Sequence, residues 1–330
     1  MSEELKDGAR GRDPYYGERV QKWQLVQRRG LPLELKERMT LMRVRSWIDH
    51  WGSWRDVCVS FSGGLDSTVL LHLCRREWPK MPAVFVDTGL EYPEVRAHAL
   101  AQPDVTVVRP AMPFTKVIEK YGYPVVSKRV AQYVHEARNC RTGSIRRLRV
   151  EGIRKDGSYS PMARISKKWL PLIDAPFKVS DRCCNVMKKR PADKVQKELG
   201  LYPLLGTRAD EGSTREQTYY RYGCNAFDLK RPRSTPMAFW REQDIWEYIR
   251  REGLAYPSVY DMGYDRTGCM FCMFGVHLEG TPNRFQRMKE THPKKWEYCM
   301  NHLGCREVLE FIGVPSEPSG QLRMFEGREV

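Results

Sequence analysis

The chain has 330 residues, of which 41% are hydrophobic, and it carries a formal net charge of +15. This length and apolar content suffice for one large α/β core or two small domains and exclude wholesale disorder. Because no run of about 18 apolar residues and no apolar N-terminal signal core occur, we expect no membrane span and a cytoplasmic location. The positive charge favours a polyanionic partner such as nucleic acid, although solubility alone would also account for it.

Along the chain, the predicted elements alternate between helices and strands. Residues 1–36 are interpreted as a polar N-terminal extension, and the apolar face of residues 37–51 predicts a helix. Strands are expected at 57–61, 83–87, 105–108 and 202–206, with helices at 67–74 and 242–252. This alternation predicts an α/β fold, in which a parallel twisted sheet carries helices on both faces in a Rossmann-like arrangement. Residues 313–330 are expected to form a loose tail.

Residues 127–170 interrupt the alternation with twelve Lys and Arg residues against three acidic ones. We interpret them as a basic insertion, a helix followed by a hairpin that turns at 155–157. Cationic side chains contact nucleic-acid phosphates, and Tyr133, Tyr159 and Trp169 are candidates to stack on bases. A solvated loop or a protein-docking surface is the alternative. The candidate nucleic-acid contacts are Lys128, Arg129, Arg146, Arg147, Arg149, Lys167 and Lys168.

The segment 60–67 is a glycine turn between a predicted strand and a predicted helix. Gly63 and Gly64 let an anion approach the backbone, and the free amides of the first helical turn attract it. Ser60, Ser62 and Ser67 add hydroxyl groups. Asp66 would repel a bare phosphate, so it is predicted to hold Mg²⁺ that bridges phosphate oxygens. The alternative is a tight turn without a ligand.

Two arginines and four of the ten cysteines are further candidates. Arg208 and Arg215 follow the strand near 202–206 and suit phosphate or sulfate oxygens, or else form surface ion pairs with Glu211 or Glu216. Two close cysteine pairs are able to supply four thiolates to one centre, and soft sulfur ligands select zinc or an iron–sulfur cluster. These are Cys183, Cys184, Cys269 and Cys272.

The Ser-Gly-Gly-Leu-Asp-Ser loop resembles the PP-loop of the N-type ATP pyrophosphatases and adenine nucleotide α-hydrolases. Segments 183–191, 206–215 and 234–240 and the C-x-x-C pair are similar to phosphoadenosine or adenosine phosphosulfate (PAPS) reductases, so the resemblance covers roughly residues 50–310. It implies an adenine nucleotide α-hydrolase-like domain at 37–312, with cysteine segments at 181–190 and 265–275. It also implies that the PP-loop contacts phosphate or its metal, and that Asp87, Thr88 and Gly89 border the nucleotide.

The same resemblance implies that the four cysteines hold a [4Fe-4S] cluster, with zinc or free thiols as alternatives. The sequence departs from the reductases because it lacks their C-terminal Glu-Cys-Gly-Leu-His motif; Cys305 is a poor match. The sequence thus keeps the four cluster cysteines and lacks the C-terminal motif. In these two respects it is similar to the branch of the family that serves DNA phosphorothioation and tRNA thiolation.

The expected activity is therefore that of an ATP pyrophosphatase that adenylates a substrate, a nucleic acid in our reading, for sulfur incorporation. Asp66 and Arg208 are its expected catalytic residues. A sulfur-donor protein such as a cysteine desulfurase, or a modification complex, would be its partner. A phosphosulfate reductase that uses Cys305 is one alternative, and a non-catalytic nucleic-acid-binding module is the other.

Overall fold

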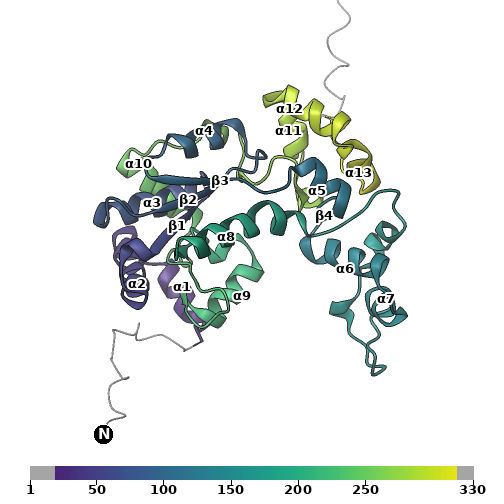
Figure 1. The fold of residues 1–330 in the computed structure, drawn as a ribbon, viewed down its shortest axis with the longest axis horizontal. Coiled ribbons are helices and arrows are strands. Elements are labelled where there is room, and N and C mark those ends of the chain that lie inside the picture. Colours follow the sequence, from purple (N-terminus) through teal and green to yellow (C-terminus); the bar gives the residue numbers. More distant parts are fainter. Residues whose placement is uncertain (1–18, 318–330) are drawn as a thin grey trace, which may run out of the picture.

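A six-stranded sheet forms the centre of the molecule in the computed structural model, which describes residues 19–317 (Figure 1). The strand order is β3-β2-β1-β5-β7-β6, and every neighbouring pair is parallel except β6 and β7. The strands are β1 (Val57–Phe61), β2 (Ala83–Val86), β3 (Val105–Val108), β5 (Tyr202–Leu204), β6 (Asn225–Ala226) and β7 (Arg233–Ser234). The predicted α/β fold is confirmed, with one antiparallel strand added at its edge.

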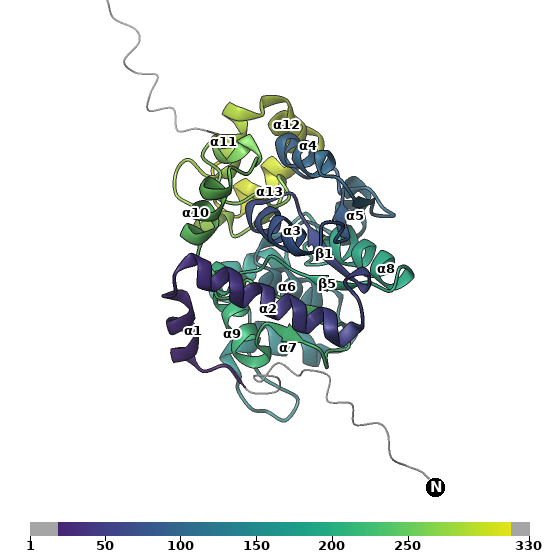
Figure 2. The ribbon, with the colours of Figure 1, turned by 90° about the vertical axis from the view of Figure 1, so that its left-hand side faces the viewer.

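Helices cover both faces of this sheet. From β1 the chain passes through α3 (Leu65–Glu77) to β2 and through α4 (Pro93–Ala101) to β3, then returns through α8 (Arg190–Glu198) to β5 on the other side of β1. Because such crossovers are right-handed, α3 and α8 lie on opposite faces. The helices α2 (Leu33–Trp51) and α10 (Glu242–Glu252) pack on α3, and α2 faces the viewer in Figure 2.

The first core lies between the sheet and these helices, and it includes part of the predicted N-terminal extension. Helix α1 (Lys22–Arg29) buries Leu25 completely, and the backbone amide of Val20 donates to the carbonyl of Tyr220 at 2.9 Å. The helix predicted from residue 37 begins at Leu33. The first residues of the predicted extension, 1–18, and the last residues of the predicted tail, 318–330, lie outside the described residues.

A second hydrophobic core joins the middle of the chain to its helical C-terminal region. It collects apolar side chains of α5 (Phe114–Tyr121), α6 (Lys128–Asn139), α11 (Arg284–Thr291), α12 (Pro293–Glu297) and α13 (Cys305–Phe311). A two-stranded parallel ladder of β4 (Val125–Val126) with β8 (Met273–Phe274) runs through it. The second C-x-x-C cysteine, Cys272, directly precedes β8, so this ladder fixes the cysteine segment to the base of α6.

The basic insertion is a lobe of two packed helices, α6 and α7 (Gly143–Val150), which stands apart from the sheet in Figure 1. The sequence predicted α6 but not α7, whose run of arginines lacks a clear apolar face. The expected hairpin is reduced to one bridge between Ile153 and Tyr159, closed by a turn in which the amide of Gly157 donates to the carbonyl of Arg154 at 3.0 Å.

Short helices complete the described chain. Helix α9 (Ser213–Tyr222) follows β5, and 3₁₀ turns occur at Trp54–Asp56, Pro161–Ala163, Lys167–Ile173, Ala209–Glu211, Ser258–Tyr260 and Val276–Leu278. Two π-helical turns, Asn185–Lys189 and Tyr298–His302, interrupt regular helices. Within residues 19–317, no helix is both long and apolar enough to cross a bilayer.

The ion pair between Lys36 of α2 and Asp244 of α10 is buried in the first core, with a distance of 2.6 Å between Nζ and Oδ2. Removing the lysine leaves the carboxylate uncompensated, so Lys36→Met should lower the free energy of unfolding by about 3–5 kcal/mol. The exposed pair of Arg45 with Glu77 is the control, and Arg45→Ala should cost less than about 1 kcal/mol. Equal losses in urea titrations of the two variants would contradict this assignment.

The pH dependence of stability follows from partly buried histidines. Burial lowers the pKa of His98 on α4 below its usual value of 6.5, and the same cause acts on His72, His135 and His277. The unfolded chain therefore binds protons more readily, and stability that is complete above pH 6.5 should be lost as the pH falls below it. His98→Asn should reduce the loss measured by urea unfolding between neutral and mildly acidic pH; an unchanged loss would contradict the prediction for this residue.

Candidate functional site

A cavity of about 440 Å³ lies at the carboxyl ends of β1 and β5, where the strand order reverses. Open α/β sheets bind their ligands at such a switch point. Seven of the predicted nucleotide-binding residues line it: Ser60, Ser62, Gly64, Asp66, Ser67, Arg208 and Arg215. Other residues of the lining were not predicted for this site, and they include Lys188, Gly206, Tyr260, Arg266 and Thr267.

The loop between β1 and α3 is preorganised by its own hydrogen bonds. The amide of Ser62 donates to the Ser67 hydroxyl at 3.1 Å, and the amide of Leu65 donates to the Tyr260 hydroxyl at 3.2 Å. Gly63 has a φ of 76°, and an added Cβ would lie 2.8 Å from the carbonyl oxygen of Val95. This glycine is therefore required by the packing of the loop on α4, although it does not line the cavity.

Asp66 and Arg208 meet at the floor of the cavity. The Nε of Arg208 donates to Oδ1 of Asp66, and its NH1 donates to both carboxylate oxygens of Asp210, at 3.0 and 2.8 Å. Burial raises the pKa of Asp66, while the charge of Arg208 opposes the rise. Within the described chain, Oδ2 of Asp66 accepts no side-chain hydrogen bond from another residue, so it is the oxygen that could bind a cation.

Arg215 forms the ion pair with Glu211 that the sequence analysis had kept as an alternative, and its side chain still lines the cavity. In total, four basic residues of the lining face five acidic ones. The basic residues are Lys188, Arg208, Arg215 and Arg266, and the acidic residues are Asp66, Asp210, Glu211, Glu242 and Asp265. This balance suits an anion that arrives with a divalent cation better than a bare phosphate.

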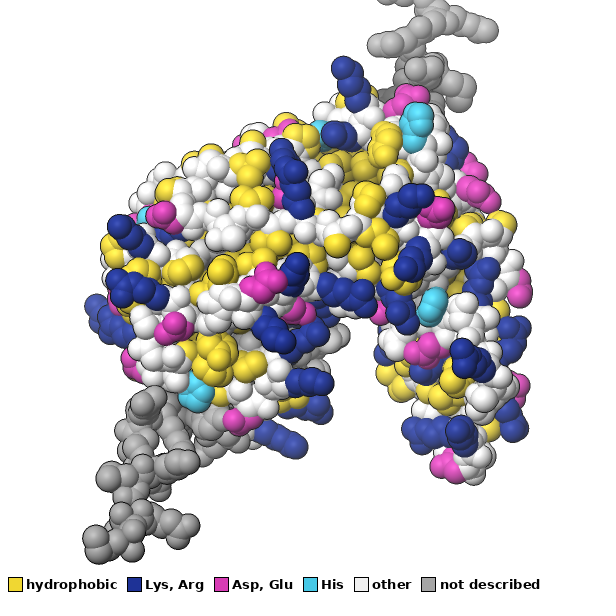
Figure 3. Space-filling view, in the orientation of Figure 1, with side chains coloured by type: hydrophobic (Ala, Val, Ile, Leu, Met, Phe, Trp, Pro, Cys, Tyr) yellow, Lys and Arg dark blue, Asp and Glu magenta, His cyan; other side chains and the backbone are white. Residues whose placement is uncertain are grey.

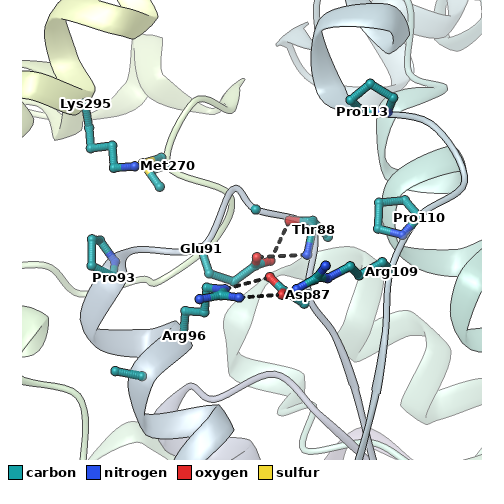
Figure 4. Close-up of a pocket in the computed structure, with 12 residues that line it drawn as sticks. Asp87, Thr88, Glu91, Pro93, Arg96, Arg109, Pro110, Pro113, Met270 and Lys295 are labelled. Atoms are coloured by element: carbon teal, nitrogen blue, oxygen red, sulfur yellow. Dashed lines mark hydrogen bonds and ion pairs between the residues drawn. The ribbon is translucent and has the colours of Figure 1, made fainter.

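Asp87, Thr88 and Gly89 line a neighbouring cavity of about 640 Å³, not the one at the PP-loop. Figure 4 shows Asp87 between two arginines: Arg96 donates to both of its carboxylate oxygens at 2.9 Å, and Arg109 lies 3.4 Å away. The Arg96 hydrogen bonds hold the pKa of Asp87 below its usual value. The side chain of Asp87 is thus committed to a salt bridge within the protein.

The four predicted cysteines are neighbours. Burial raises the pKa of the Cys183 thiol, and the charges of Cys269, Cys184 and Cys272 raise it further. Burial also raises the pKa of the Cys272 thiol, to about 11. Within residues 19–317, no group of three or more His, Cys, Asp or Glu side chains closes around a single metal ion. The thiols therefore share one region without converging on one point. Four soft donors in one region fit a multi-iron cluster.

Lys188 lies between the cysteines and the PP-loop cavity. Its pKa is raised, chiefly by the charge of Cys269, and its Nζ lies 3.9 Å from Oε1 of Glu91. Glu91 is buried and accepts hydrogen bonds from the amide and the hydroxyl of Thr88, at 3.0 and 2.7 Å. One lysine thus connects the cysteine set, the nucleotide cavity and the loop after β2.

The predicted nucleic-acid contacts separate into two groups. Lys128, Arg129, Arg146, Lys167 and Lys168 are exposed on the lobe. Arg147 pairs with Glu151, whereas Arg149 binds Glu136 at 2.7 Å and covers the ring of Tyr133 at 3.7 Å. Arg149 therefore holds α7 on α6. Of the three proposed stacking residues, Tyr159 is the exposed one.

Comparison with protein families gives the decisive assignment. Residues 56–142 and 158–274, more than half of the chain, match the phosphoadenosine phosphosulfate reductase domain. The chain belongs to this family. Residues 143–157, which comprise α7 and the turn after it, lie between the two matched segments. The lobe is thus in part an addition to the family domain.

Known relatives within the family are distant. An uncharacterized protein of Methanocaldococcus jannaschii is 25% identical over 256 residues, which cover 75% of this chain and 48% of the relative. The adenosine 5′-phosphosulfate reductase of Geobacillus thermodenitrificans is 21% identical over 76% of this chain and 86% of its own. Sulfate adenylyltransferase subunit 2 of Streptomyces lavendulae is 24% identical over 63% of this chain and 57% of its own.

The chain spans 48%, 42% and 57% of the lengths of three of the curated relatives it matches. Among solved structures, a phosphoadenylyl-sulfate reductase from Candida auris aligns with a TM-score of 0.40 and 16% identity, over 76% of this chain and 96% of that one.

Gly206 offers a test of the site geometry. An added Cβ would lie 2.9 Å from the carbonyl carbon and oxygen of Asp66, so Gly206→Ala must push the loop away from β5. We expect at least about tenfold weaker binding of MgATP, or about 1.4 kcal/mol, in calorimetry. Gly280→Ala, where an added Cβ meets nothing within 4 Å, is the control. Unchanged affinity in Gly206→Ala would show that the nucleotide does not use this loop.

Proposed function

We propose that the protein is an ATP pyrophosphatase of the phosphosulfate reductase family that activates a nucleic acid for sulfur incorporation. The observation that carries the proposal is the PP-loop cavity, in which the amides at the start of α3 lie beside Asp66 and Arg208. The amides of Ser62 and Leu65 already donate to hydroxyl groups of the protein, so a phosphate would meet the remaining amides of the first turn of α3. The near balance of acidic and basic residues suits a nucleotide with its Mg²⁺.

In the proposed reaction, an acceptor oxygen attacks the α-phosphorus of ATP. The new oxygen–phosphorus bond forms as the bond from the α-phosphorus to the bridging oxygen breaks, and pyrophosphate leaves with the electron pair. Lys188, Arg208 and the loop amides would bear the negative charge that develops on the phosphates, since they line the cavity. A sulfur nucleophile then displaces AMP from the activated acceptor. Asp66 would hold Mg²⁺ through Oδ2.

For the cysteine set we propose a [4Fe-4S] cluster on Cys183, Cys184, Cys269 and Cys272. Such a cluster supplies electron transfer or a sulfur-binding centre when it is bound. The chain's own contribution would be Lys188, whose ammonium lies beside Cys269, would offset the charge of a metal-bound thiolate there and also lines the nucleotide cavity. Loss of the cluster ligands should therefore also disturb the nucleotide site.

Reduction of a sulfonucleotide is the second candidate, because several relatives carry the name adenosine 5′-phosphosulfate reductase. That reaction needs a thiol at the reacting sulfur. Cys305 is fully buried in the second core beside Cys299, and it lines neither the PP-loop cavity nor the cavity at Asp87. This position favours the pyrophosphatase.

The activity is tested with anaerobically purified protein, MgATP and an oligonucleotide. We expect release of pyrophosphate and AMP, and a loss of at least about 100-fold in Asp66→Asn, since a phosphate-bound cation loses its ligand. Asp49→Asn, which changes an exposed carboxylate on α2, should retain activity. Release of ADP and phosphate, or of sulfite from a sulfonucleotide with thioredoxin present, would exclude the pyrophosphatase.

The cluster is tested separately by iron and acid-labile sulfide analysis of the same preparation. Cys184→Ser should lose iron and the visible absorption of the cluster, whereas Cys140→Ser, a half-buried thiol on the lobe, should keep both. Zinc in place of iron, or iron retained in Cys184→Ser, would contradict the ligand assignment.

A further inference from the structure

A third cavity, of about 380 Å³, lies where the lobe meets the segment that leads into α8. One wall is a face of α6, and the other is the turn that carries the first cysteine pair. Its lining is Lys128, Gln132, His135, Glu136, Asp181, Arg182, Cys184, Asn185 and Lys189. It shares no lining residue with the PP-loop cavity. Lys188 and Lys189 are the last two residues of the π-helical turn Asn185–Lys189, and they thus line two different cavities.

The space-filling view shows a notch in the surface between the lobe and the rest of the molecule (Figure 3). A deep notch separates the lobe from the body of the molecule, and Lys and Arg side chains stand on both of its sides (Figure 3). In the same orientation, α8 and α9 border the notch on one side and α6 and α7 on the other (Figure 1). The elements that line the cavity are those that meet at the closed end of the notch.

The lining of the cavity is net positive, with three cations and two carboxylates. Lys128, Arg182 and Lys189 form no ion pair with a carboxylate anywhere in residues 19–317. Of the two acidic residues in the lining, Glu136 is already paired with Arg149 at 2.7 Å, which leaves Asp181 alone against three cations. Three cations held around one concave space are the arrangement that a phosphate group needs.

The chemistry of the lobe favours contacts to phosphates over contacts to bases. Tyr133 is covered by the guanidinium of Arg149, and the ring of Trp169 packs edge-on against His277 at 5.0 Å. Tyr159 is the proposed stacking residue left exposed, and it lies next to the turn beyond α7. Phosphate contacts carry no sequence information, so binding should depend strongly on salt and weakly on sequence.

We propose that a nucleic-acid backbone lies in this notch and that one of its phosphates occupies the cavity beside Cys184. The proposal rests on the proposed function in taking nucleic acid as the acceptor. It adds where the backbone is held: at the junction of the lobe and the cysteine segment, by Lys128, Arg182 and Lys189. It also assigns Asp181 an opposing effect, because this carboxylate repels the phosphate.

The test is the salt dependence of binding to fluorescein-labelled single-stranded DNA and RNA, followed by anisotropy between about 50 and 200 mM salt. Lys128→Ala and Lys189→Ala should each weaken binding and lower the slope of log Kd against log salt by about 0.7, the value for one lost phosphate contact on a single strand. Lys80→Ala, which removes an exposed lysine that precedes β2 and does not line the cavity, should leave the slope unchanged. Asp181→Asn should tighten binding.

Slopes in Lys128→Ala and Lys189→Ala that equal the slope of Lys80→Ala would overturn the proposal, as would weaker binding in Asp181→Asn. Lys128 and Lys189 are exposed, and unchanged urea unfolding of both variants shows that a lost slope is not a lost fold. Pyrophosphate release distinguishes this proposal from the proposed function. If the notch variants change the salt dependence but no pyrophosphate is released, the notch proposal stands and the pyrophosphatase is rejected. If pyrophosphate is released but the slopes of the notch variants equal that of the unaltered protein, the pyrophosphatase stands and the notch proposal is rejected.

Discussion

The backbone of Gly206 lies so close to the first turn of α3 that no side chain fits between them. This approach brings the end of β5 against the PP-loop, and two residues later it delivers Arg208 to the carboxylate of Asp66. The cavity and the pairing of the Asp66 carboxylate with the Arg208 guanidinium both follow from that contact. The parallel pairing of β1 with β5, at the point where the strand order reverses, sets the contact in turn.

Local patterns predicted most of this site, because its chemistry is encoded in short runs. The glycines and hydroxyls of the loop and the two cysteine pairs are contiguous in the chain, and the alternation of strands with helices gave the sheet. Contacts that depend on distant partners were not predictable from such runs. Asp87 was expected at the nucleotide, but Arg96 and Arg109 bind it. Arg149 was expected to contact nucleic acid, but it pairs with Glu136 within the lobe.

Lys188 shows why such residues are not identified from the sequence alone. It stands in the run Lys188-Lys189-Arg190, in which nothing distinguishes one cation from the next. Successive residues of any helical turn point in different directions, and here the first lysine lies toward Glu91 and the PP-loop cavity while the second lines the other cavity. The packing of this turn in the folded chain sets which lysine lines which cavity, so the run itself does not reveal it.

The ladder of β4 with β8 is only two residues long on each side, yet it joins two parts of the molecule with different tasks. Cys272 enters the ladder from one side, and the chain leaves it on the other through Ser127 into α6. Because Val125 and Val126 pair with Met273 and Phe274, one short element sets the position of both the cysteine turn and the root of the lobe. A substitution that breaks this pairing would therefore affect both parts of the molecule at once.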